Sequence, residues 1–408
     1  MSIDFLSIAK NHSTPLYVYD FDAIQSRLRQ LRSLFGENIQ LYYAVKANSN
    51  LKLLTYMRRF IDGLDISSAG EMKQALLASY QTDQLSFAGP GKTTQELEFA
   101  VKNDCGSINV ESIDEIKALI TITEQLNCKV NIFLRINPAQ LTPQFAIKMG
   151  GKATQFGIEE ENIEQAISLI SQHNHLFNFI GYHIYAGTQC LDPQGLLDNI
   201  AYTLNLVQRL VSQHSLKPHK LNLGGGFGLP YFENDHELDI KEVAQNINSM
   251  LRTFEKINSL NLTYVLELGR YIVGEFGYYL TKILATKESR GKTYCIVDGG
   301  MHQNMSAGGN FGQIIRKNYK IRNLSHCSEP MKKVDLAGCL CTTLDTLATN
   351  IYINSPKVGD VLLFENSGAY GFTASPLLFL GHETPKEILI REGQMEIIRS
   401  SKQLTDFN

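Results

Sequence analysis

The sequence predicts a (β/α)₈ barrel followed by a mostly β C-terminal domain, and three observations support this prediction. The chain has 408 residues, whereas such a barrel takes about 250, so a second domain is expected. Short apolar runs alternate with helical patterns as far as about Leu280, and few helical patterns follow. We therefore expect an N-terminal segment at 1–21 that joins or links to the β domain, a barrel at 22–280 and a β domain at 281–408.

The first barrel helix is expected to start near Asp22, with Asp20 or Asp22 as its cap and Gly36 after its end. One face of this helix is apolar, formed by Ile24, Leu28, Leu31 and Phe35. Eight strands follow in the order Gln40–Ala47, Gly63–Ser68, Leu85–Gly89, Ser107–Glu111, Val130–Asn137, Phe179–Ala186, Lys220–Leu223 and Tyr264–Leu268. Helical patterns lie between them, such as Leu191–His214. A doubly wound sheet could be built from the same elements and stays open as an alternative.

The C-terminal part is predicted to be rich in strands, because β-branched runs are separated by turn residues. The expected strands are Tyr294–Val297, Lys333–Gly338, Asn350–Ile353 and Asp360–Glu365. Thr14–Tyr19 either contributes a further strand to this domain or links the domains.

Composition excludes several classes of function. The net charge is −3 and the sequence pI is about 6.4, so nucleic acid and anionic membranes are not expected as partners. No apolar run reaches the roughly 20 residues of a membrane helix, and Met1–Thr14 has no signal-peptide pattern. The seven cysteines form no C-x-x-C pair, so neither a metal site nor a disulfide framework is expected. We expect a protein of the reducing cytoplasm.

The barrel prediction places catalytic groups at the carboxyl ends of the strands. Strand one ends in an apolar stretch that contains Lys46, and a buried lysine suits an imine with an aldehyde cofactor. A lysine at the mouth of a strand, with its ammonium in water, is the simpler alternative. Strand seven runs into Gly224-Gly225-Gly226 and strand eight into Glu267-Leu268-Gly269-Arg270. A glycine run can hold an anion on its N–H groups or form only a tight turn, and Glu267 with Arg270 can be a local ion pair.

Two further candidates lie elsewhere in the chain. His183, in strand six, could lay its ring on a planar cofactor or be a satisfied core residue. Cys339 and Cys341 are two residues apart, and in a strand both would point to the same face. Buried, inert cysteines are the ordinary expectation for such a pair.

These motifs, taken together and in this order, resemble the fold-type-III pyridoxal-phosphate decarboxylases, the family of diaminopimelate and eukaryotic-type ornithine decarboxylases. The resemblance extends from Thr14 to about His382. It rests on Tyr42-Tyr43-Ala44-Val45-Lys46-Ala47-Asn48, Gln155-Phe156-Gly157-Ile158, His183, the glycine run, Glu267-Leu268-Gly269-Arg270, Asp298-Gly299-Gly300, Cys341 and Gly368-Ala369-Tyr370-Gly371. It implies an alanine-racemase-like fold and decarboxylation of an amino acid.

The resemblance also implies a role for each site residue. Lys46 would hold pyridoxal 5'-phosphate as a Schiff base, His183 would stack on its ring and Glu267 would face its ring nitrogen. The phosphate and substrate would be bound by Gly225, Gly226, Gly269, Arg270 and Tyr370, with Thr342 and Asp345 also placed at the substrate. Cys341 would donate a proton in the active site of a second subunit, so a homodimer with shared sites is implied. Cys341 is preferred to Cys339 because it lies three residues before Leu344, as the family pattern requires.

Departures from the family pattern concern the substrate. Diaminopimelate decarboxylases carry a glutamate after the catalytic cysteine, where this chain has Thr342, and an arginine after the Asp-Gly-Gly motif, where it continues Met301-His302-Gln303. Without this acid and this base, the distal charges of diaminopimelate would go unpaired. Lys148–Lys152, Cys341–Asp345 and Gly368–Phe379 resemble a side branch that contains the decarboxylase of glutamyl-carrier-protein thioesters in aminoglycoside synthesis and relatives from siderophore and exosortase-linked clusters. Asn310-Phe311-Gly312-Gln313 and Arg316 resemble its exosortase-linked members.

We therefore expect a decarboxylase of a modified, conjugated or carrier-bound amino acid. The alternatives are diaminopimelate decarboxylase, whose distal ligands would come from other positions, and an amino-acid racemase. Glu267 counts against the racemase, because racemases of this fold place an arginine at the ring nitrogen. A non-catalytic relative and a lone-barrel cofactor-binding protein are further alternatives. The retained Lys46 and Cys341 count against the first, and the β domain counts against the second.

Overall fold

The computed structural model describes residues 3–140, 143–309 and 317–408. The chain forms two compact units. One comprises Arg27–Leu229 and His236–Gly269, and the other comprises Met1–Ser26, Pro230–Asp235 and Arg270–Asn408. This division differs from the predicted limit at 280, because residues from Arg270 onward belong to the second unit. Among the described residues, no helix is long and apolar enough to cross a membrane.

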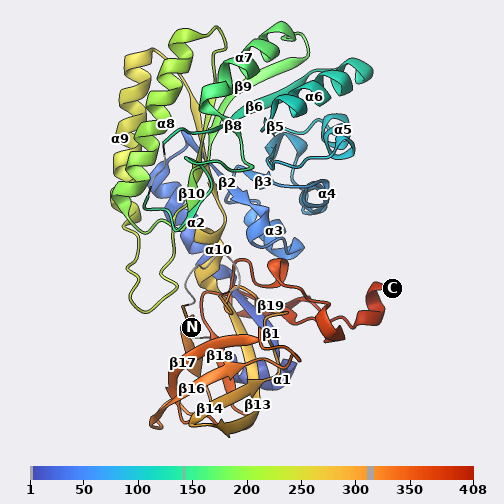
Figure 1. Ribbon diagram of the computed structural model, residues 1–408, viewed down its shortest axis with the longest axis vertical. Coiled ribbons are helices and arrows are strands. Elements are labelled where there is room, and N and C mark those ends of the chain that lie inside the picture. Colours follow the sequence, from blue (N-terminus) through green and yellow to red (C-terminus); the bar gives the residue numbers. More distant parts are fainter. Residues whose placement is uncertain (1–2, 141–142, 310–316) are drawn as a thin grey trace. The chain divides into compact units, whose positions relative to one another are not determined.

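The first unit is a closed barrel of eight parallel strands (Figure 1). They are β2 (Ile39–Ala44), β3 (Gly63–Ile66), β4 (Leu85–Phe87), β5 (Ser107–Val110), β6 (Val130–Asn137), β9 (Phe177–Ile184), β11 (Lys220–Gly225) and β12 (Thr263–Leu268). Strand β2 pairs with β12 on one side and β3 on the other, and the β5–β6 pairing completes the ring. All eight predicted strands are present, so the barrel prediction is confirmed and the doubly wound alternative is wrong.

Helices lie on the outside of the barrel in Figure 1. Helix α2 (Phe21–Phe35) precedes the first barrel strand, and successive strands are connected by α3 (Leu51–Met57), α4 (Ala69–Leu77), α5 (Thr94–Lys102), α6 (Ile113–Leu126), α7 (Ile163–Gln172), α8 (Pro193–Gln213) and α9 (Ile240–Asn258). Their starts follow ordinary capping chemistry. Asp20 accepts a hydrogen bond from the N–H of Ala23 at the start of α2, and Asp192 caps α8, where Pro193 occupies the first turn.

The second unit is built on a large mixed sheet in the order β17-β16-β14-β13-β1-β19-β20, with β18 joining β13 to β15. Its elements are α1 (Phe5–His12), β1 (Leu16–Asp20), α10 (Arg270–Val273), β13 (Gly277–Ser289), β14 (Lys292–Val297), β15 (Ile321–Asn323), β16 (Met331–Ala337), β17 (Thr346–Asn354), β18 (Val361–Phe364), β19 (Lys386–Arg391) and β20 (Gln394–Arg399). Its core includes Leu16, Val18, Leu280, Leu363 and Ile388.

The N-terminal segment supplies a central strand of this sheet. Strand β1 pairs antiparallel with β13 and parallel with β19, so residues far apart in sequence are adjacent here. Both faces of β1 are buried, with Leu16 and Val18 on the apolar core cluster. Of the two alternatives for Thr14–Tyr19, the strand is the one observed, and the predicted strands β14, β16, β17 and β18 are present, but the sequence did not predict β13, β15, β19 or β20.

One local prediction is wrong, because the first strand ends at Ala44 and Val45–Ala47 form a 3₁₀ turn that contains Lys46. The stretch from Gly338 to Asp345 is a turn between β16 and β17, so the strand geometry considered for Cys339 and Cys341 does not apply. The cause is Asp345, whose carboxylate accepts hydrogen bonds from the N–H groups of Met301 and Leu340 and thereby holds the loop in a tight turn.

Candidate active site

Lys46 lies at the carboxyl end of β2, where the barrel fold places its catalytic groups. Its Nζ is 3.2 Å from Oδ2 of Asp65, which lies in β3, and its side chain is 41% exposed while that of Asp65 is 2% exposed. The other oxygen of Asp65, Oδ1, has no hydrogen-bond partner among the described residues. Burial and the nearby carboxylate of Glu267 raise the pKa of Asp65 to about 6, although Lys46 and His183 act in the opposite direction. An accessible amine therefore stands beside a buried acid that can take up a proton.

Glu267 is a buried carboxylate at the end of β12, and it is held from two sides. Its Oε1 accepts a hydrogen bond from Nδ2 of Asn222 at 2.5 Å, and its Oε2 is 3.3 Å from Nε2 of His183. Burial raises the pKa of this carboxyl. The imidazole of His183, the Asn222 hydrogen bond and the charge of Lys46 outweigh burial, so the pKa lies below its usual value. Glu267 is thus a fixed negative charge inside the barrel.

His183 and Tyr185 come from the same strand end and have different surroundings. His183 is 1% exposed and faces Glu267, as described above. Tyr185 is half-buried, and its ring lies beside the two cations of the site, 5.9 Å from Nζ of Lys46 and 6.0 Å from the guanidinium carbon of Arg135. The aromatic ring next to the amine of Lys46 is therefore that of Tyr185. Tyr185 was not among the predicted site residues, although alternation along a strand puts positions 183 and 185 on one face.

The glycine run at the end of β11 has no room for side chains. A Cβ atom on Gly225 would lie 2.0 Å from the carbonyl oxygen of Glu267, and one on Gly226 would lie 2.4 Å from that of Gly187. Gly226 also has a φ of +89°, which L residues adopt only with strain. Gly269, at the end of β12, packs closely on Ala44 and Ala47. Such glycines leave backbone N–H groups accessible, which is what an anion-binding loop requires.

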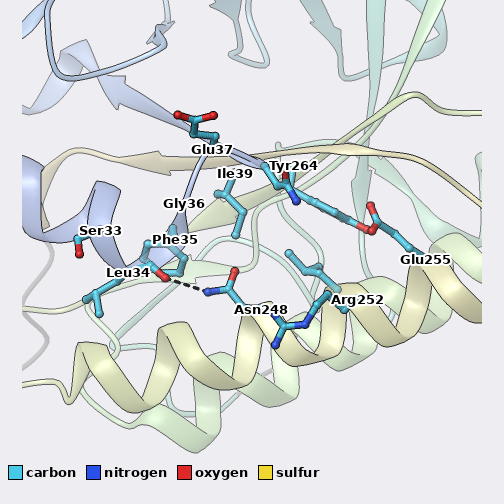
Figure 2. A pocket seen from close by; sticks show the side chains of 12 residues that line it. Ser33, Leu34, Phe35, Gly36, Glu37, Ile39, Asn248, Arg252, Glu255 and Tyr264 are labelled. Atoms are coloured by element: carbon cyan, nitrogen blue, oxygen red, sulfur yellow. Dashed lines mark hydrogen bonds between the residues drawn. The ribbon is translucent and has the colours of Figure 1, made fainter.

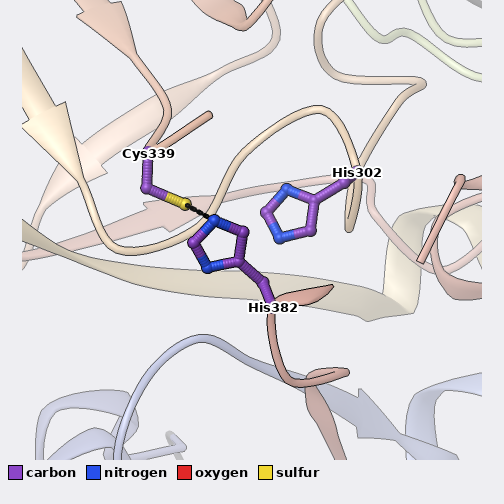
Figure 3. A group of neighbouring side chains, drawn as sticks. All are labelled: His302, Cys339 and His382. Atoms are coloured by element: carbon purple, nitrogen blue, oxygen red, sulfur yellow. Dashed lines mark hydrogen bonds between the residues drawn. The ribbon is translucent and has the colours of Figure 1, made fainter. Parts of the chain in front are cut away.

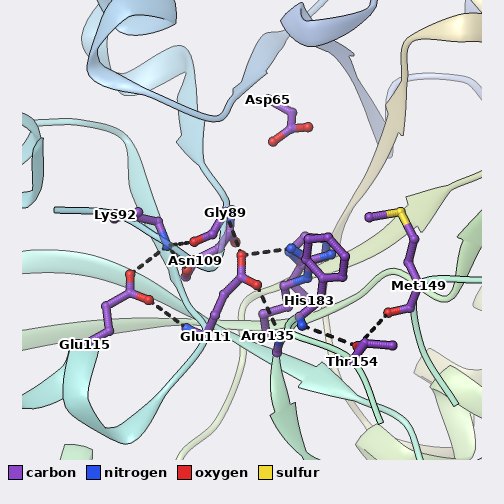
Figure 4. Close-up of polar contacts among 12 residues, drawn as sticks. Asp65, Gly89, Lys92, Asn109, Glu111, Glu115, Arg135, Met149, Thr154 and His183 are labelled. Carbon is purple, nitrogen blue, oxygen red and sulfur yellow. Dashed lines mark hydrogen bonds and ion pairs between the residues drawn. The ribbon is translucent and has the colours of Figure 1, made fainter. Parts of the chain in front are cut away.

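A buried polar network lies at the carboxyl ends of β5 and β6, and Figure 4 shows it beside Asp65 and His183. Arg135 pairs with Glu111 at 2.8 Å, and Glu111 also accepts hydrogen bonds from the N–H groups of Gly89 and Gly157. The guanidinium of Arg135 lies 5.1 Å from the ring of Phe156. This explains the Gln155-Phe156-Gly157 motif, because Phe156 covers Arg135 and Gly157 supplies a donor to its partner. The charges of Arg135 and Lys92 offset the effect of burial on Glu111, and its pKa is lowered.

Arg270 lies in the second unit, among three tyrosines. Its Nη1 donates a hydrogen bond to the hydroxyl of Tyr231 at 3.1 Å, and its guanidinium is 4.7 Å from the ring of Tyr370. Tyr319 packs on Tyr231, with the ring centroids 5.0 Å apart. The Nε of Arg270 is buried and has no hydrogen-bond partner among the described residues. The structure thus brings Arg270 and Tyr370 together. The Nε–H group of the guanidinium can still donate a hydrogen bond to an anion.

The loop between β16 and β17 separates the two neighbouring thiols. Cys341 is exposed, whereas Cys339 is half-buried with its Sγ 3.9 Å from Nε2 of His382. Asp345 is 3% exposed and holds the loop, as described above. Thr342 is half-buried, and its hydroxyl accepts a hydrogen bond from the N–H of Leu344. The assignment of Thr342 and Asp345 to the substrate stays a prediction. Arg316 and the Asn310–Gln313 motif lie outside the described residues.

A separate hollow of about 320 Å³ lies at the opposite end of the barrel (Figure 2). It is bordered by residues that precede β2 and by α9, whose Asn248 donates a hydrogen bond to the carbonyl of Leu34 at 2.9 Å. The amino ends of the strands serve stability in this fold, whereas catalysis takes place at the carboxyl ends. This hollow is therefore not the candidate active site.

Comparisons with known proteins identify the family. Residues 21–274 match the model of the pyridoxal-dependent decarboxylase, pyridoxal binding domain. The L-glutamyl-[BtrI acyl-carrier protein] decarboxylase of Niallia circulans is 35% identical, over 97% of this chain and 93% of that protein. The 2-[(L-alanin-3-ylcarbamoyl)methyl]-2-hydroxybutanedioate decarboxylase of Staphylococcus aureus is 31% identical, over 94% and 96%. The crystal structure of Helicobacter pylori diaminopimelate decarboxylase complexed with L-lysine is 28% identical, with a TM-score of 0.88 over 99% and 98% of the chains.

The residues at the barrel mouth fit pyridoxal phosphate. An accessible lysine amine suits the aldehyde, a buried carboxylate with a lowered pKa suits a protonated ring nitrogen, and a glycine cradle that any Cβ would fill suits the phosphate. These features agree with the match of 21–274 to the pyridoxal binding domain. The chain belongs to the fold-type-III pyridoxal-dependent decarboxylases, and it is a carboxy-lyase whose cofactor is pyridoxal phosphate.

Proposed function

We propose that the protein removes a carboxyl group from an amino acid that is modified, conjugated or bound to a carrier protein. The observation that carries the proposal is the neutral Thr342 directly after Cys341, together with the stretch Met301–Gly309, which contains no arginine. A site built for free diaminopimelate must pair a distal ammonium and a distal carboxylate, because unpaired charges weaken binding strongly. A substrate whose distal end is neutral or linked to a larger group needs no such pair.

The names of two relatives support this choice of substrate class. One relative acts on an L-glutamyl group on an acyl-carrier protein. The other acts on an L-alanin-3-ylcarbamoyl conjugate. In both names the amino acid is attached to a second group, and these two proteins are 35% and 31% identical to this chain.

We also propose specific roles for the residues of the barrel mouth. The bound cofactor supplies the electron sink that accepts the bonding electrons when CO₂ leaves. Lys46 anchors the cofactor, and Asp65 is placed to exchange a proton with the lysine amine. Glu267 keeps a proton on the ring nitrogen, and His183 with Asn222 holds this carboxylate in position. Gly225 and Gly226 present N–H groups to the phosphate, and the predicted roles of Gly269, Arg270 and Tyr370 complete the set.

Tyr185 is our choice for the ring that covers the cofactor, in place of the predicted His183. Its ring is 5.9 Å from Nζ of Lys46, whereas Nε2 of His183 is 3.3 Å from a carboxylate oxygen of Glu267, so His183 faces that carboxylate. His183 then becomes a positioning residue for Glu267. This assignment follows from the surroundings of the two side chains, and a flat ring beside the lysine suits a planar cofactor.

Cys341 is proposed as the proton donor after CO₂ has left, acting in the site of a second copy of the chain. Its loop supports this role, because the thiol is exposed and the side chain of Leu344 nearby is 65% exposed. An exposed thiol is accessible to another chain, and an exposed leucine near it suits an interface. A homodimer with shared sites is therefore part of the proposal.

We further place the protein in the cytoplasm, as its seven unpaired cysteines suggest.

The experiment compares released CO₂ from three substrates: a glutamyl thioester of an acyl-carrier protein, an alanine conjugate with a carbamoyl link, and free meso-diaminopimelate. The cofactor-loaded wild type should act on a linked substrate, and Lys46→Ala should release no CO₂ from any of them. Efficient turnover of free diaminopimelate would instead support the second candidate, diaminopimelate decarboxylase. The observation that favours this candidate is the TM-score of 0.88 to the Helicobacter enzyme.

A further inference from the structure

Three side chains from distant parts of the second unit meet in a cluster that the decarboxylation chemistry does not use: His302, Cys339 and His382 (Figure 3). His302 follows β14, Cys339 lies between β16 and β17, and His382 precedes β19. One nitrogen or sulfur atom from each residue lies within 4.8 Å of the other two. The Sγ of Cys339 is 3.9 Å from Nε2 of His382, and the two imidazole rings are 5.1 Å apart.

His302 is the member of the cluster that most needs an explanation. Its side chain is 0% exposed, and neither ring nitrogen has a hydrogen-bond partner among the described residues. A buried polar group without a partner costs about 1–3 kcal/mol, and such groups are rare in native proteins. The ring of His302 lies next to that of His382 in Figure 3, and one of its nitrogens is within 4.8 Å of a possible ligand atom of each of the other two side chains. A ligand at this point would satisfy it.

We propose that His302, Cys339 and His382 bind one zinc ion. Two imidazoles and a thiolate are ligands that zinc prefers, and the absence of a carboxylate from this trio disfavours magnesium and calcium. Around a tetrahedral zinc ion, neighbouring sulfur and nitrogen ligands are about 3.3–3.7 Å apart. The 3.9 Å between Cys339 and His382 is already close to this value, and the ligand atom of His302 lies within 4.8 Å of both.

The backbone around the three ligands is held in place before any ion binds. Gln303, next to His302, donates a hydrogen bond to the carbonyl of Glu383, which is next to His382, at 2.8 Å. The N–H of Cys339 donates to the carbonyl of Gly299 at 3.2 Å, so the first two ligand segments are joined as well. Gln303 is itself fixed by the hydroxyl of Tyr279, which donates to its side-chain oxygen at 2.8 Å. Supporting contacts of this kind are a regular feature of metal sites.

The ion would stabilise the loop that carries Cys341. Cys339 is two residues from Cys341 in a turn that Asp345 holds on one side, and zinc at Cys339 would hold it on the other. Zinc would join three segments that are separated by more than thirty residues from one another in sequence. Three protein ligands also leave a fourth position for water or another small ligand. The inference concerns this cluster alone and does not depend on which amino acid is the substrate.

The test measures metal in the full-length, cofactor-loaded protein after treatment with a chelator, addition of zinc and removal of the excess. The wild type should retain one zinc per chain, and Cys339→Ser and His382→Gln should each lose it. Cys341→Ser is the matched control, since its thiol is two residues away and exposed, and it should retain the zinc. Cobalt in place of zinc should give the wild type and Cys341→Ser a thiolate-to-cobalt absorption band that Cys339→Ser lacks.

Three results would overturn the proposal: a wild type that retains no zinc, zinc retention by both Cys339→Ser and His382→Gln, or loss of the cobalt band in Cys341→Ser instead of Cys339→Ser. If Cys339→Ser does not fold, the half-buried His382 provides the second variant, and its circular dichroism spectrum shows whether the fold is intact. Retention of one zinc by a folded His382→Gln protein would then count against the site.

Discussion

The glycine run Gly224–Gly226, which is proposed to hold the cofactor phosphate and is called the glycine cradle here, allows a quantitative test with Gly226→Ala. Gly226 has a φ of +89°, and the new Cβ would lie 2.4 Å from the carbonyl oxygen of Gly187 and 2.6 Å from the ring of Phe145. The left-handed conformation alone costs about 1–2 kcal/mol for an L residue. Because the backbone must also move away from Gly187, at least one N–H should lose its place at the cofactor phosphate. A charge-assisted hydrogen bond is worth about 1.5–3 kcal/mol, which is about 10- to 150-fold in affinity.

Gly36→Ala is the matched control in the same unit. Gly36 has a φ of +71°, but nothing lies within 4 Å of the position that a Cβ would take. Both variants should therefore lose stability in urea unfolding of the cofactor-free protein, while only Gly226→Ala should lose affinity in a titration with pyridoxal phosphate followed by its visible absorption. Equal cofactor affinity in the two variants would refute the cradle, because strain without a lost contact would then explain both.

Three further predictions concern the aromatic ring of Tyr185, the carboxyl group of Asp65 and the choice of substrate at Thr342. Tyr185→Ala should weaken cofactor binding by about 0.5–1.5 kcal/mol, the value of an aromatic stack, whereas Tyr185→Phe keeps the ring and should bind the cofactor like wild type. Equal cofactor dissociation constants for the two variants would assign the covering of the cofactor ring to His183 instead. The pKa of Asp65 is raised from 3.8 to about 6, so its contribution to the stability of the cofactor-free protein is complete below pH 4 and is lost as the pH rises through 6. Asp65→Asn should lack this loss in unfolding experiments across that range, and parallel profiles for both proteins would contradict the shift. Thr342→Glu should raise kcat/KM for meso-diaminopimelate up to about fivefold, since an exposed ion pair is worth about 0.2–1 kcal/mol; no gain would show that position 342 does not face the distal ammonium.

The barrel could be predicted in detail because its signals are local. Each strand is a short apolar run followed by a helix, and all eight expected strands are present within a few residues of their predicted ends. The second unit was harder to predict, because its strands pair across long distances. Strand β1 lies between β13 and β19, and nothing local in Leu16–Asp20 indicates either partner. The amphipathic strands β19 and β20 carry a similarly weak local signal.

Site residues that belong to a sequence motif could be predicted. Residues whose role depends on the neighbouring side chains in the fold were harder to predict. Lys46, the glycine run and Glu267 lie at strand ends, as the motif order indicates. Which ring lies beside Lys46 depends on where Glu267 points, so the pattern alone could not distinguish His183 from Tyr185.

Other residues carried even weaker signals. Asp65 and Asn222 are single polar residues in buried strands, a signal that could have been noted. The cluster of His302, Cys339 and His382 had no signal, because its members are separated by more than thirty residues and no C-x-x-C pair marks them.

The central claim is that a cofactor held by Lys46 removes CO₂ from a linked amino acid. The most direct measurement is the rate of CO₂ release by the cofactor-loaded protein from a glutamyl thioester of an acyl-carrier protein and from free meso-diaminopimelate, with Lys46→Ala in parallel. The account predicts turnover of the linked substrate, little or none of free diaminopimelate, and none of either by Lys46→Ala. Faster turnover of free diaminopimelate, or turnover by Lys46→Ala equal to wild type, would contradict it.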